Sequence, residues 1–180
     1  KLPIDLLTSG IFASHFINTV SPRFLWEIVE GWHSVVPWSV RQEIRNKYYA
    51  GCASGILNAP DASYHPSTDD ALVQKFGADD FLEGKRANKL ALQHELGLEQ
   101  NPDASMFFWP SRLDPVQKGP QLVTDILFKM VSYYWHKGLQ VAVVANGPHE
   151  VHFKQIIKDF NLGKRVAIVD FNERLSRMAY

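Results

Sequence analysis

Two cations, Arg112 and Lys118, flank a short polar segment in the second half of the chain. The apolar run at residues 107–109 predicts a strand before them, and Gly119, followed by proline, predicts a helix start after them. A guanidinium grips phosphate oxygens through paired hydrogen bonds, and an ammonium adds a mobile charge. With the backbone donors of a helix N-terminus, they could stabilise the charge that develops when a sugar–diphosphate bond breaks. A solvated loop with ordinary surface charges explains the same residues equally well.

Two more strand-to-helix turns follow. Asn146 and Gly147 come after the apolar run 141–145, and Phe171 comes after the run 165–170. In open α/β sheets, ligands bind outside the carboxyl ends of the strands, so these turns are expected to line one nucleotide crevice, with Phe171 stacking on the base. Taken alone, the first turn is more simply a capped connection, and Phe171 an aromatic side chain at the rim of the core.

Other catalytic patterns are missing. His149 and His152 are three residues apart, whereas the zincin pattern needs four, and no third ligand is evident. There is no P-loop, no G-x-G-x-x-G and no G-x-S-x-G. We therefore expect no metal site and no cofactor. The five tryptophans are expected to pack in the core or at its rim rather than to form a platform for sugars.

The amino-acid composition narrows the classes of partner that the chain can be expected to bind. Hydrophobic residues make up 46% of the 180 residues, enough for a core. The 19 basic and 19 acidic residues cancel, which argues against general nucleic-acid binding. The single cysteine, Cys52, excludes an intramolecular disulfide and fits a reducing compartment. No apolar run approaches the roughly 20 residues that span a bilayer, so no membrane partner is expected. The oligomeric state stays open.

The order of elements predicts the fold class. From residue 105 onward strand and helix patterns alternate, and the run 141–145 is apolar without alternation, which is typical of a strand buried on both faces. We therefore predict an α/β fold, a Rossmann-like parallel sheet with helices on both faces. Expected helices span about 2–9, 22–30, 38–49, 85–98, 121–137, 149–160 and 173 onward, and expected strands span 16–20, 54–58, 105–109, 140–145 and 165–170.

Three further expectations concern local features and organisation. Ser21 should cap the second helix, with Phe24 among the residues on its apolar face. The segment 60–70, rich in proline, serine and aspartate, is expected to be a linker or hinge. The chain starts without methionine and stops inside a helical pattern, which predicts a piece of a longer protein.

Six segments, in order, resemble motifs of the bacterial glycogen synthase and plant starch synthase family, whose members use ADP-glucose and have the two-domain GT-B fold. Each match is short, but six at the family's order and spacing are specific. They are T-V-S-P at 19–22 with E-I at 27–28, G-I-L-N-A-P-D at 55–61, Y-H-P-S-T-D at 64–69, K-x-x-N-K-x-x-L-Q at 85–93 with L-G-L at 96–98, S-R-L at 111–113 with Q-K-G at 117–119, and E-x-L-S at 173–176.

The resemblance implies roles for individual residues and for the two parts of the chain. Arg112 and Lys118 would be the catalytic residues, stabilising ADP as the leaving group while glucose passes, with retention, to the non-reducing end of an α-1,4-glucan. The nucleotide would be bound by Ser111, Gly119, Asn146, Gly147, Phe171 and Glu173. Residues 1–61 would be the end of the N-terminal Rossmann domain with the interdomain crossing, and 62–180 the first part of the C-terminal donor-binding domain. The location would be the cytoplasm, or the plastid in a plant.

Departures from the family pattern leave alternatives open. Ala59 and Pro60 replace the Gly-Ile of N-G-I-D, and Asn146-Gly147-Pro148 stands where the family has G-x-G. The family's K-x-G-G loop and its E-x-x-G segment are not in this chain. The chain by itself is therefore expected to be inactive. A non-catalytic glucan-binding or regulatory relative, or a GT-B enzyme that uses another nucleotide sugar, remains an alternative.

Overall fold

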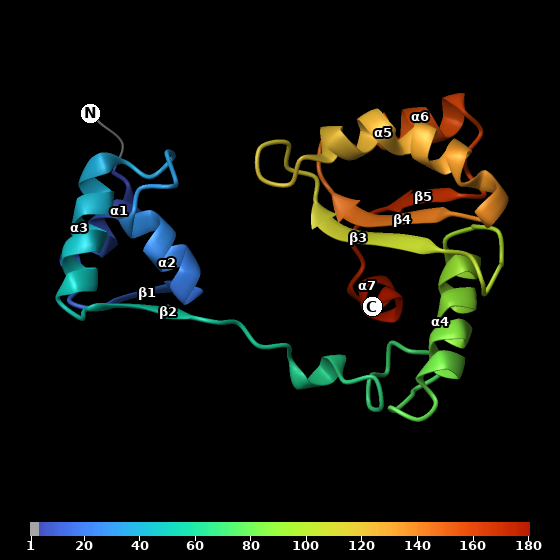
Figure 1. The fold of residues 1–180 in the computed structure, drawn as a ribbon, viewed down its shortest axis with the longest axis horizontal. Coiled ribbons are helices and arrows are strands. Elements are labelled where there is room, and N and C mark those ends of the chain that lie inside the picture. The colour runs from blue at the N-terminus through green and yellow to red at the C-terminus, as the bar shows by residue number, and fades with distance from the viewer. Residues whose placement is uncertain (1–3) are drawn as a thin grey trace. The chain divides into compact units, whose positions relative to one another are not determined.

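The computed structural model describes residues 4–180 (Figure 1). The chain divides into two compact units, one ending at Pro60 and the other spanning Asp61–Tyr180. The boundary falls at the start of the segment expected to be a linker or hinge, and residues 61–70 of that segment fold into the second unit. They contain the short 3-10 helix η1 (Ala62–Tyr64), and Asp69 is only 3% exposed. Residues 61–70 are not a free linker, because Asp69 pairs with Arg177 from the far end of the chain.

The first unit has two parallel strands, β1 (Ile17–Val20) and β2 (Ala53–Ile56), and α1 (Leu6–Ala13) precedes them. Helices α2 (Pro22–Val29) and α3 (Trp38–Tyr49) pack against the strands, and α1 packs against α3. Helix α2 begins as predicted, because the Ser21 hydroxyl accepts hydrogen bonds from the backbone N–H groups of Arg23 and Phe24. Its core-forming residues, together with those of α3, are Leu25, Ile28, Val29, Val40 and Ile44.

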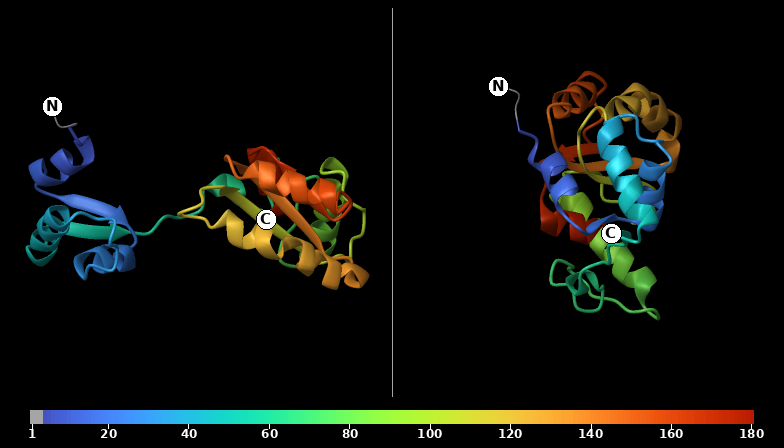
Figure 2. Two further views of the ribbon diagram at one scale, coloured as in Figure 1. Left: turned by 90° about the horizontal axis from the view of Figure 1, so that it is seen from above. Right: turned by 90° about the vertical axis from the view of Figure 1, so that its left-hand side faces the viewer.

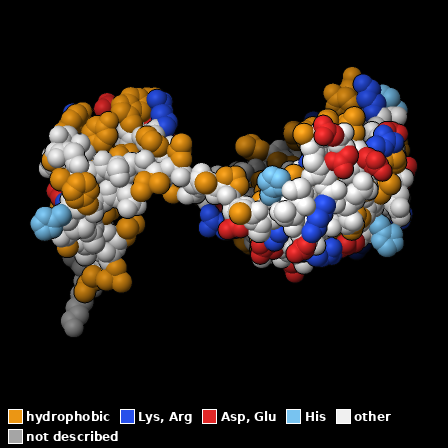
Figure 3. Space-filling view, turned by 90° about the horizontal axis from the view of Figure 1, so that it is seen from below, with side chains coloured by type: hydrophobic (Ala, Val, Ile, Leu, Met, Phe, Trp, Pro, Cys, Tyr) orange, Lys and Arg blue, Asp and Glu red, His pale blue; other side chains and the backbone are white. Residues whose placement is uncertain are grey.

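Two expectations for this unit were wrong. Helix α1 begins at Leu6, not at residue 2, because the Asp5 carboxylate caps it by accepting hydrogen bonds from the N–H groups of Leu7 and Thr8. Residues 2 and 3 lie outside the described residues. Phe24, expected on the buried face of α2, is exposed. Large hydrophobic side chains cover much of the visible surface of this unit (Figure 3).

The second unit confirms the predicted α/β fold. Its parallel strands β3 (Met106–Arg112), β4 (Gln140–Asn146) and β5 (Val166–Val169) lie in the order β3-β4-β5. Helices α5 (Pro120–Tyr133) and α6 (Glu150–Asp159) cover one face, and α7 (Glu173–Ala179) lies on the other, packed beside α4 (Phe81–Glu95) (Figures 1 and 2). A 3-10 turn, η2 (Trp135–Lys137), follows α5. Residues 141–145 of β4 are all buried, as their unbroken apolar run predicted.

Helix α4 carries buried polar residues that its apolar pattern did not indicate. Asn88 is 2% exposed, and its amide accepts from the N–H of Val73 and donates to the carbonyl of Gln74. Gln93, fully buried, donates to Gln140 Oε1 at 2.8 Å. Both residues belong to the K-x-x-N-K-x-x-L-Q segment, and they fix neighbouring loops to the helix. Among residues 4–180, no helix combines the length and hydrophobicity needed to cross a bilayer.

Candidate nucleotide-binding site

A cavity of about 410 Å³ opens at the carboxyl ends of the strands in the second unit. Its walls bring together four of the residues expected to contact a nucleotide, Ser111 and Arg112 from β3, Asn146 from β4 and Phe171 after β5, with Pro110 and Tyr180 beside them. The other four expected residues, Lys118, Gly119, Gly147 and Glu173, do not line this cavity. The sheet therefore brings half of the residues expected to contact a nucleotide together at one cavity.

Arg112 lies at the end of a strand rather than in a turn. Strand β3 was expected to stop at Trp109, yet it continues through Pro110 to Arg112, which pairs in register with Asn146. Within the described sheet β3 is an edge strand, where a residue without an N–H group can be accommodated. The extension places the Arg112 backbone in the sheet, so the guanidinium projects from a fixed base.

The Arg112 guanidinium is held by a neutral partner. Its Nη2 donates to Gln117 Oε1 at 3.1 Å, and no carboxylate of residues 4–180 lies within ion-pair distance. Asp114 shapes the turn between them, because its carboxylate accepts from the N–H groups of Val116 and Gln117. The positive charge of Arg112 is therefore positioned without being neutralised.

Lys118 and Gly119 belong to the turn that starts α5. The Lys118 side chain is exposed, and its backbone N–H donates to the carbonyl of Asp114 at 2.9 Å. Gly119 has the left-handed φ of 61° at the N-cap of α5. Both residues thus set where the helix begins, and only the flexible Lys118 side chain could bring a charge toward the cavity.

Asn146 joins all three strand ends. Its Oδ1 accepts from the N–H of Phe171 at 2.8 Å, and its main-chain carbonyl accepts from the N–H of Leu113 at 2.8 Å. One residue at the end of β4 therefore fixes the loop after β3 and the loop after β5. The sequence pattern suggested a ligand-binding residue here and did not indicate this connecting role.

Gly147 is needed for packing. Its φ is 148°, and an added Cβ would lie 2.9 Å from Leu113 Cβ and 3.1 Å from Leu113 N. A side chain would push the β4–α6 turn away from the β3–α5 loop. Gly147 therefore permits close contact between two protein loops.

The His149-x-x-His152 pair sits at the start of α6. His149 Nε2 lies 3.1 Å from Thr124 Oγ1, and the two imidazole centroids are 4.5 Å apart. Burial first, and then the nearby His152, hold the pKa of His149 below its ordinary value. In the described part of the chain, no group of three His, Cys, Asp or Glu residues is arranged to hold a metal ion.

The loop after β5 presents an aromatic ring and caps a helix. Phe171 is 56% exposed at the cavity wall. Asn172 accepts from the N–H of Leu175 at 3.0 Å and caps α7. Glu173 is exposed in the first turn of α7, with a carboxylate oxygen 3.9 Å from Arg177 Nη1. Glu173 is not among the residues that line the cavity.

Helix α7 is anchored through Arg177. Its Nε donates to Asp69 Oδ2 at 3.0 Å and its Nη2 to Asp69 Oδ1 at 2.5 Å. Nη2 also donates to the carbonyl of Ser63 at 2.7 Å. Burial acts to raise the pKa of Asp69, but hydrogen bonds from Arg177 and the N–H of Ala71 lower it below its ordinary value. The pair fixes the segment after Asp61 to the helix that follows the Phe171 loop.

No protein-family model matches the chain. Several curated proteins, however, match its sequence. The glycogen synthase of Exiguobacterium sibiricum is 38% identical over 125 residues, which cover 69% of this chain and 25% of that protein. The glycogen synthase of Paramagnetospirillum magneticum is 38% identical over 145 residues, 80% of this chain and 27% of that protein.

A solved structure extends the match to three dimensions. The catalytic domain of starch synthase IV from Arabidopsis thaliana, bound to ADP and acarbose, superposes with a TM-score of 0.75 at 27% identity, over 97% of this chain and 34% of that one. The chain belongs to the glycogen synthase and starch synthase family. Its fold is accordingly part of the GT-B glycosyltransferase fold, and it spans about a quarter to a third of the length of these relatives.

In this glycogen synthase family chain, several motif residues join segments of the second unit without lining the 410 Å³ cavity. Asp69, Asn88 and Gln93 are all buried and hydrogen-bonded to other segments. A polar residue inside a motif, at a position facing the core, is the signal that could have identified them.

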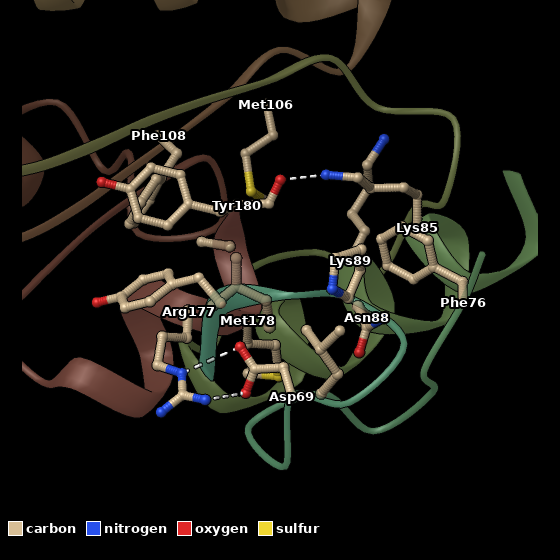
Figure 4. Close-up of a pocket in the computed structure, with 15 residues that line it drawn as sticks. Asp69, Phe76, Lys85, Asn88, Lys89, Met106, Phe108, Arg177, Met178 and Tyr180 are labelled. Atoms are coloured by element: carbon tan, nitrogen blue, oxygen red, sulfur yellow. Dashed lines mark hydrogen bonds and ion pairs between the residues drawn. The ribbon is translucent and has the colours of Figure 1, made fainter. Parts of the chain in front are cut away.

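A second cavity, of about 520 Å³, lies between the segment after Asp61, α4, β3 and α7 (Figure 4). Its walls include Phe76, Met106, Phe108 and Met178. Arg177 at its edge is paired with Asp69. None of the residues expected to bind the nucleotide lines it.

Proposed function

We propose that a protein containing this chain transfers glucose from ADP-glucose to the non-reducing end of an α-1,4-glucan with retention, and that this chain supplies part of the donor site. The observation that carries the proposal is the Arg112 guanidinium, fixed at the carboxyl end of β3 beside Asn146 and Phe171 and without a carboxylate partner among residues 4–180. The similarity to glycogen synthases and to a starch synthase structure bound to ADP supports it.

The proposed reaction requires the protein to stabilise ADP as a leaving group. As the bond between the glucose carbon and the diphosphate breaks, negative charge grows on the phosphate oxygens. Arg112 can meet two of those oxygens with parallel N–H donors, at a position set by the sheet. Lys118 adds a charge on a long side chain at the start of α5, and the N–H groups of that helix start add a partial positive charge. The exposed ring of Phe171 offers a surface on which adenine can stack.

The remaining participants follow from this reaction. The partners are a nucleotide sugar and an α-1,4-glucan, and no cofactor is required beyond the donor itself. The unit that spans Asp61–Tyr180 would be the first part of the donor-binding domain. The place of action would be the cytoplasm, or the plastid for a plant protein.

The altered glycine loop is compatible with a working site. A non-catalytic relative was an alternative because Asn146-Gly147-Pro148 replaces the family's G-x-G. Gly147, however, keeps the close contact with Leu113, and Asn146 contributes a hydrogen bond to the Phe171 loop. The loop is thus held against both neighbouring loops, which favours a retained donor site.

Calorimetric titration of ADP onto the chain tests the proposal. Arg112→Ala should weaken ADP binding about tenfold, since it removes a charged hydrogen-bonding partner. Lys118→Ala should weaken it by a smaller factor. Lys129→Ala, which removes an exposed lysine from the same helix α5, is the matched control and should have no effect. ADP binding that survives both Arg112→Ala and Lys118→Ala would contradict the assigned roles.

Identifying the donor nucleotide and the reaction requires an assay of the longer protein. Incorporation of glucose into glycogen is measured with ADP-glucose and with UDP-glucose as donors. Preference for ADP-glucose supports the proposal. Preference for UDP-glucose favours the alternative donor, and no transfer from either one favours a binding or regulatory relative.

A further inference from the structure

A contact between the β4–α6 turn and helix α5 lies next to the candidate donor site. His149 follows Pro148 at the N-cap of α6, and its Nε2 lies 3.1 Å from Oγ1 of Thr124, which belongs to α5. His149 does not line the 410 Å³ cavity, but it comes three residues after Asn146, which does. The contact therefore joins the beginnings of the two helices that follow β3 and β4.

The hydrogen bonds around Thr124 assign the direction of this contact. A threonine hydroxyl has one proton, and the carbonyls of Pro120 and Gln121 lie 3.3 and 3.0 Å from Oγ1. When either carbonyl takes that proton, the hydroxyl oxygen can only accept, so Nε2 of the neutral His149 ring carries the hydrogen and donates it. Nδ1, the ring nitrogen nearer the backbone, is then the atom that a further proton would occupy.

The surroundings of His149 favour the uncharged ring. The ring is half-buried, its centroid is 4.5 Å from that of His152, and a cation at the N-terminus of α6 opposes the helix dipole. Asp125 on α5 acts in the other direction, and Glu150 is already paired with Lys154. Burial first, and then His152, hold the pKa of His149 below its ordinary value of 6.5. The stability that the neutral ring contributes is therefore complete above pH 6.5 and is lost as the pH falls through the folded-state pKa.

The turn that His149 holds also carries contacts of the candidate site. Asn146 accepts from the N–H of Phe171, and Gly147 approaches Leu113 so closely that an added Cβ would lie 2.9 Å from Leu113 Cβ. These two contacts attach the turn to the loops after β5 and β3. His149 adds an attachment to α5, so a change at this ring can move the residues that line the cavity.

We propose that His149 is a positioning residue, which holds the β4–α6 turn against α5 while its ring is neutral and releases the turn in mild acid. A protonated ring could keep its contact with Thr124 only as a half-buried charge beside a second imidazole, so it turns toward water. The turn that carries Asn146 then loses one attachment, and ADP binds more weakly. The effect on ADP rests on the proposed function, whereas the attachment itself does not.

Hydrogen exchange measures the attachment without nucleotide. The amide of Glu150 donates to the carbonyl of Gly147 across this turn, and its protection is corrected for the intrinsic rate of each sequence. At neutral pH, His149→Ala should lower this protection about fivefold, and His149→Gln, which keeps an uncharged N–H donor of similar reach, should retain most of it. At about pH 5.5 the unaltered chain should be less protected than His149→Gln. His136→Gln, which removes an exposed histidine just after α5, is the matched control and should behave as the unaltered chain.

Calorimetric titration of ADP then tests the consequence for the donor site. At neutral pH, His149→Ala should weaken ADP binding about threefold, and His149→Gln should restore it. The dissociation constant of the unaltered chain is divided by that of His149→Gln at each pH, which cancels the ionisation of the ADP phosphate itself. This ratio should rise about threefold between neutral pH and about pH 5.5, in about 0.15 M salt to screen the imidazolium charge. His152→Gln removes the neighbouring imidazole and should move the rise to higher pH.

The outcomes separate this inference from the proposed function. Equal protection of Glu150 in His149→Ala and the unaltered chain, or protection that does not change with pH relative to His149→Gln, overturns the attachment. ADP binding that is equal in His149→Ala and the unaltered chain, or that is stronger in acid for the unaltered chain than for His149→Gln, overturns the positioning role. An unaltered chain that shows the pH-dependent protection but binds no ADP would keep the attachment and refute the donor site.

Discussion

The side-chain oxygen of Asn146 lies 2.8 Å from the main-chain nitrogen of Phe171 and accepts its hydrogen bond. The carbonyl of Asn146 accepts at the same time from the N–H of Leu113. Two loops that carry the candidate diphosphate and adenine contacts are thus joined through one residue at the end of the central strand. Asn146 is best understood as a positioning residue.

Replacing Asn146 should separate positioning from ligand binding. Asn146→Ala removes the acceptor, so hydrogen exchange at the Phe171 amide should accelerate about fivefold. Asn146→Asp keeps an acceptor oxygen and should preserve the slow exchange. Adenosine, which carries no phosphate, should bind Asn146→Ala more weakly than Asn146→Asp in calorimetric titration. Equal exchange at Phe171 in both variants would argue against the link.

Gly147→Ala should destabilise the second unit. The new Cβ would lie 2.9 Å from Leu113 Cβ, at a φ of 148° that side chains rarely adopt. We expect a loss of about 1–3 kcal/mol in the free energy of unfolding, measured by urea denaturation. Gly163→Ala is the matched control, since a Cβ added at that position would have nothing within 4 Å and the φ of Gly163 is unexceptional. Equal stability of the two variants would contradict the packing role of Gly147.

The fold was largely predictable because its signals are local. The unbroken apolar run in β4 and the Ser21-Pro22 helix start each depend on a few neighbouring residues. The end of β3 was missed because a proline normally argues against a strand. Here, pairing with β4 carries the strand on to Arg112. Pairing between strands is a tertiary property, and local sequence does not reveal it.

Only part of the arrangement around the 410 Å³ cavity could be predicted, for the same reason. Family motifs indicated Arg112 and Phe171, which the sheet brings to one cavity. They also indicated Glu173, which lies in the first turn of α7 and is not among the residues that line this cavity. The burial of Asp69 depends on Arg177, 108 residues away, and no local pattern contains that information.

The Asp69–Arg177 pair should make the second unit sensitive to acid. The pKa of Asp69 in the folded chain lies below its ordinary value of 3.8. Its stabilising contribution is therefore complete above the unfolded-state pKa and is lost as the pH falls through the folded-state pKa. Asp69→Asn should lower the Tm at neutral pH and reduce the additional loss in acid. Asp70→Asn, whose side chain is 93% exposed, should have little effect on either.

Replacing Arg177 should destabilise the second unit more than replacing Asp69 does. Arg177→Ala leaves the Asp69 carboxylate buried without its cation, whereas Asp69→Asn leaves a neutral amide that can still accept from Arg177. The Tm at neutral pH should therefore fall further for Arg177→Ala than for Asp69→Asn. The reverse order would mean that the buried Asp69 carboxylate does not depend on its cation, and that its contact with the N–H of Ala71 matters more than the ion pair.

Phe171 and Arg112 should bind different parts of ADP, the adenine and the diphosphate. Phe171→Ala removes the stacking surface, so it should weaken ADP binding about tenfold and leave inorganic pyrophosphate binding unchanged. Arg112→Ala should weaken both ligands, because both carry the diphosphate. Phe107→Ala, which removes a ring that is 60% exposed on β3 and outside the cavity lining, controls for loss of an exposed aromatic residue. If Phe171→Ala weakened pyrophosphate as much as ADP, the loop would act on the diphosphate, and the adenine would have to lie elsewhere.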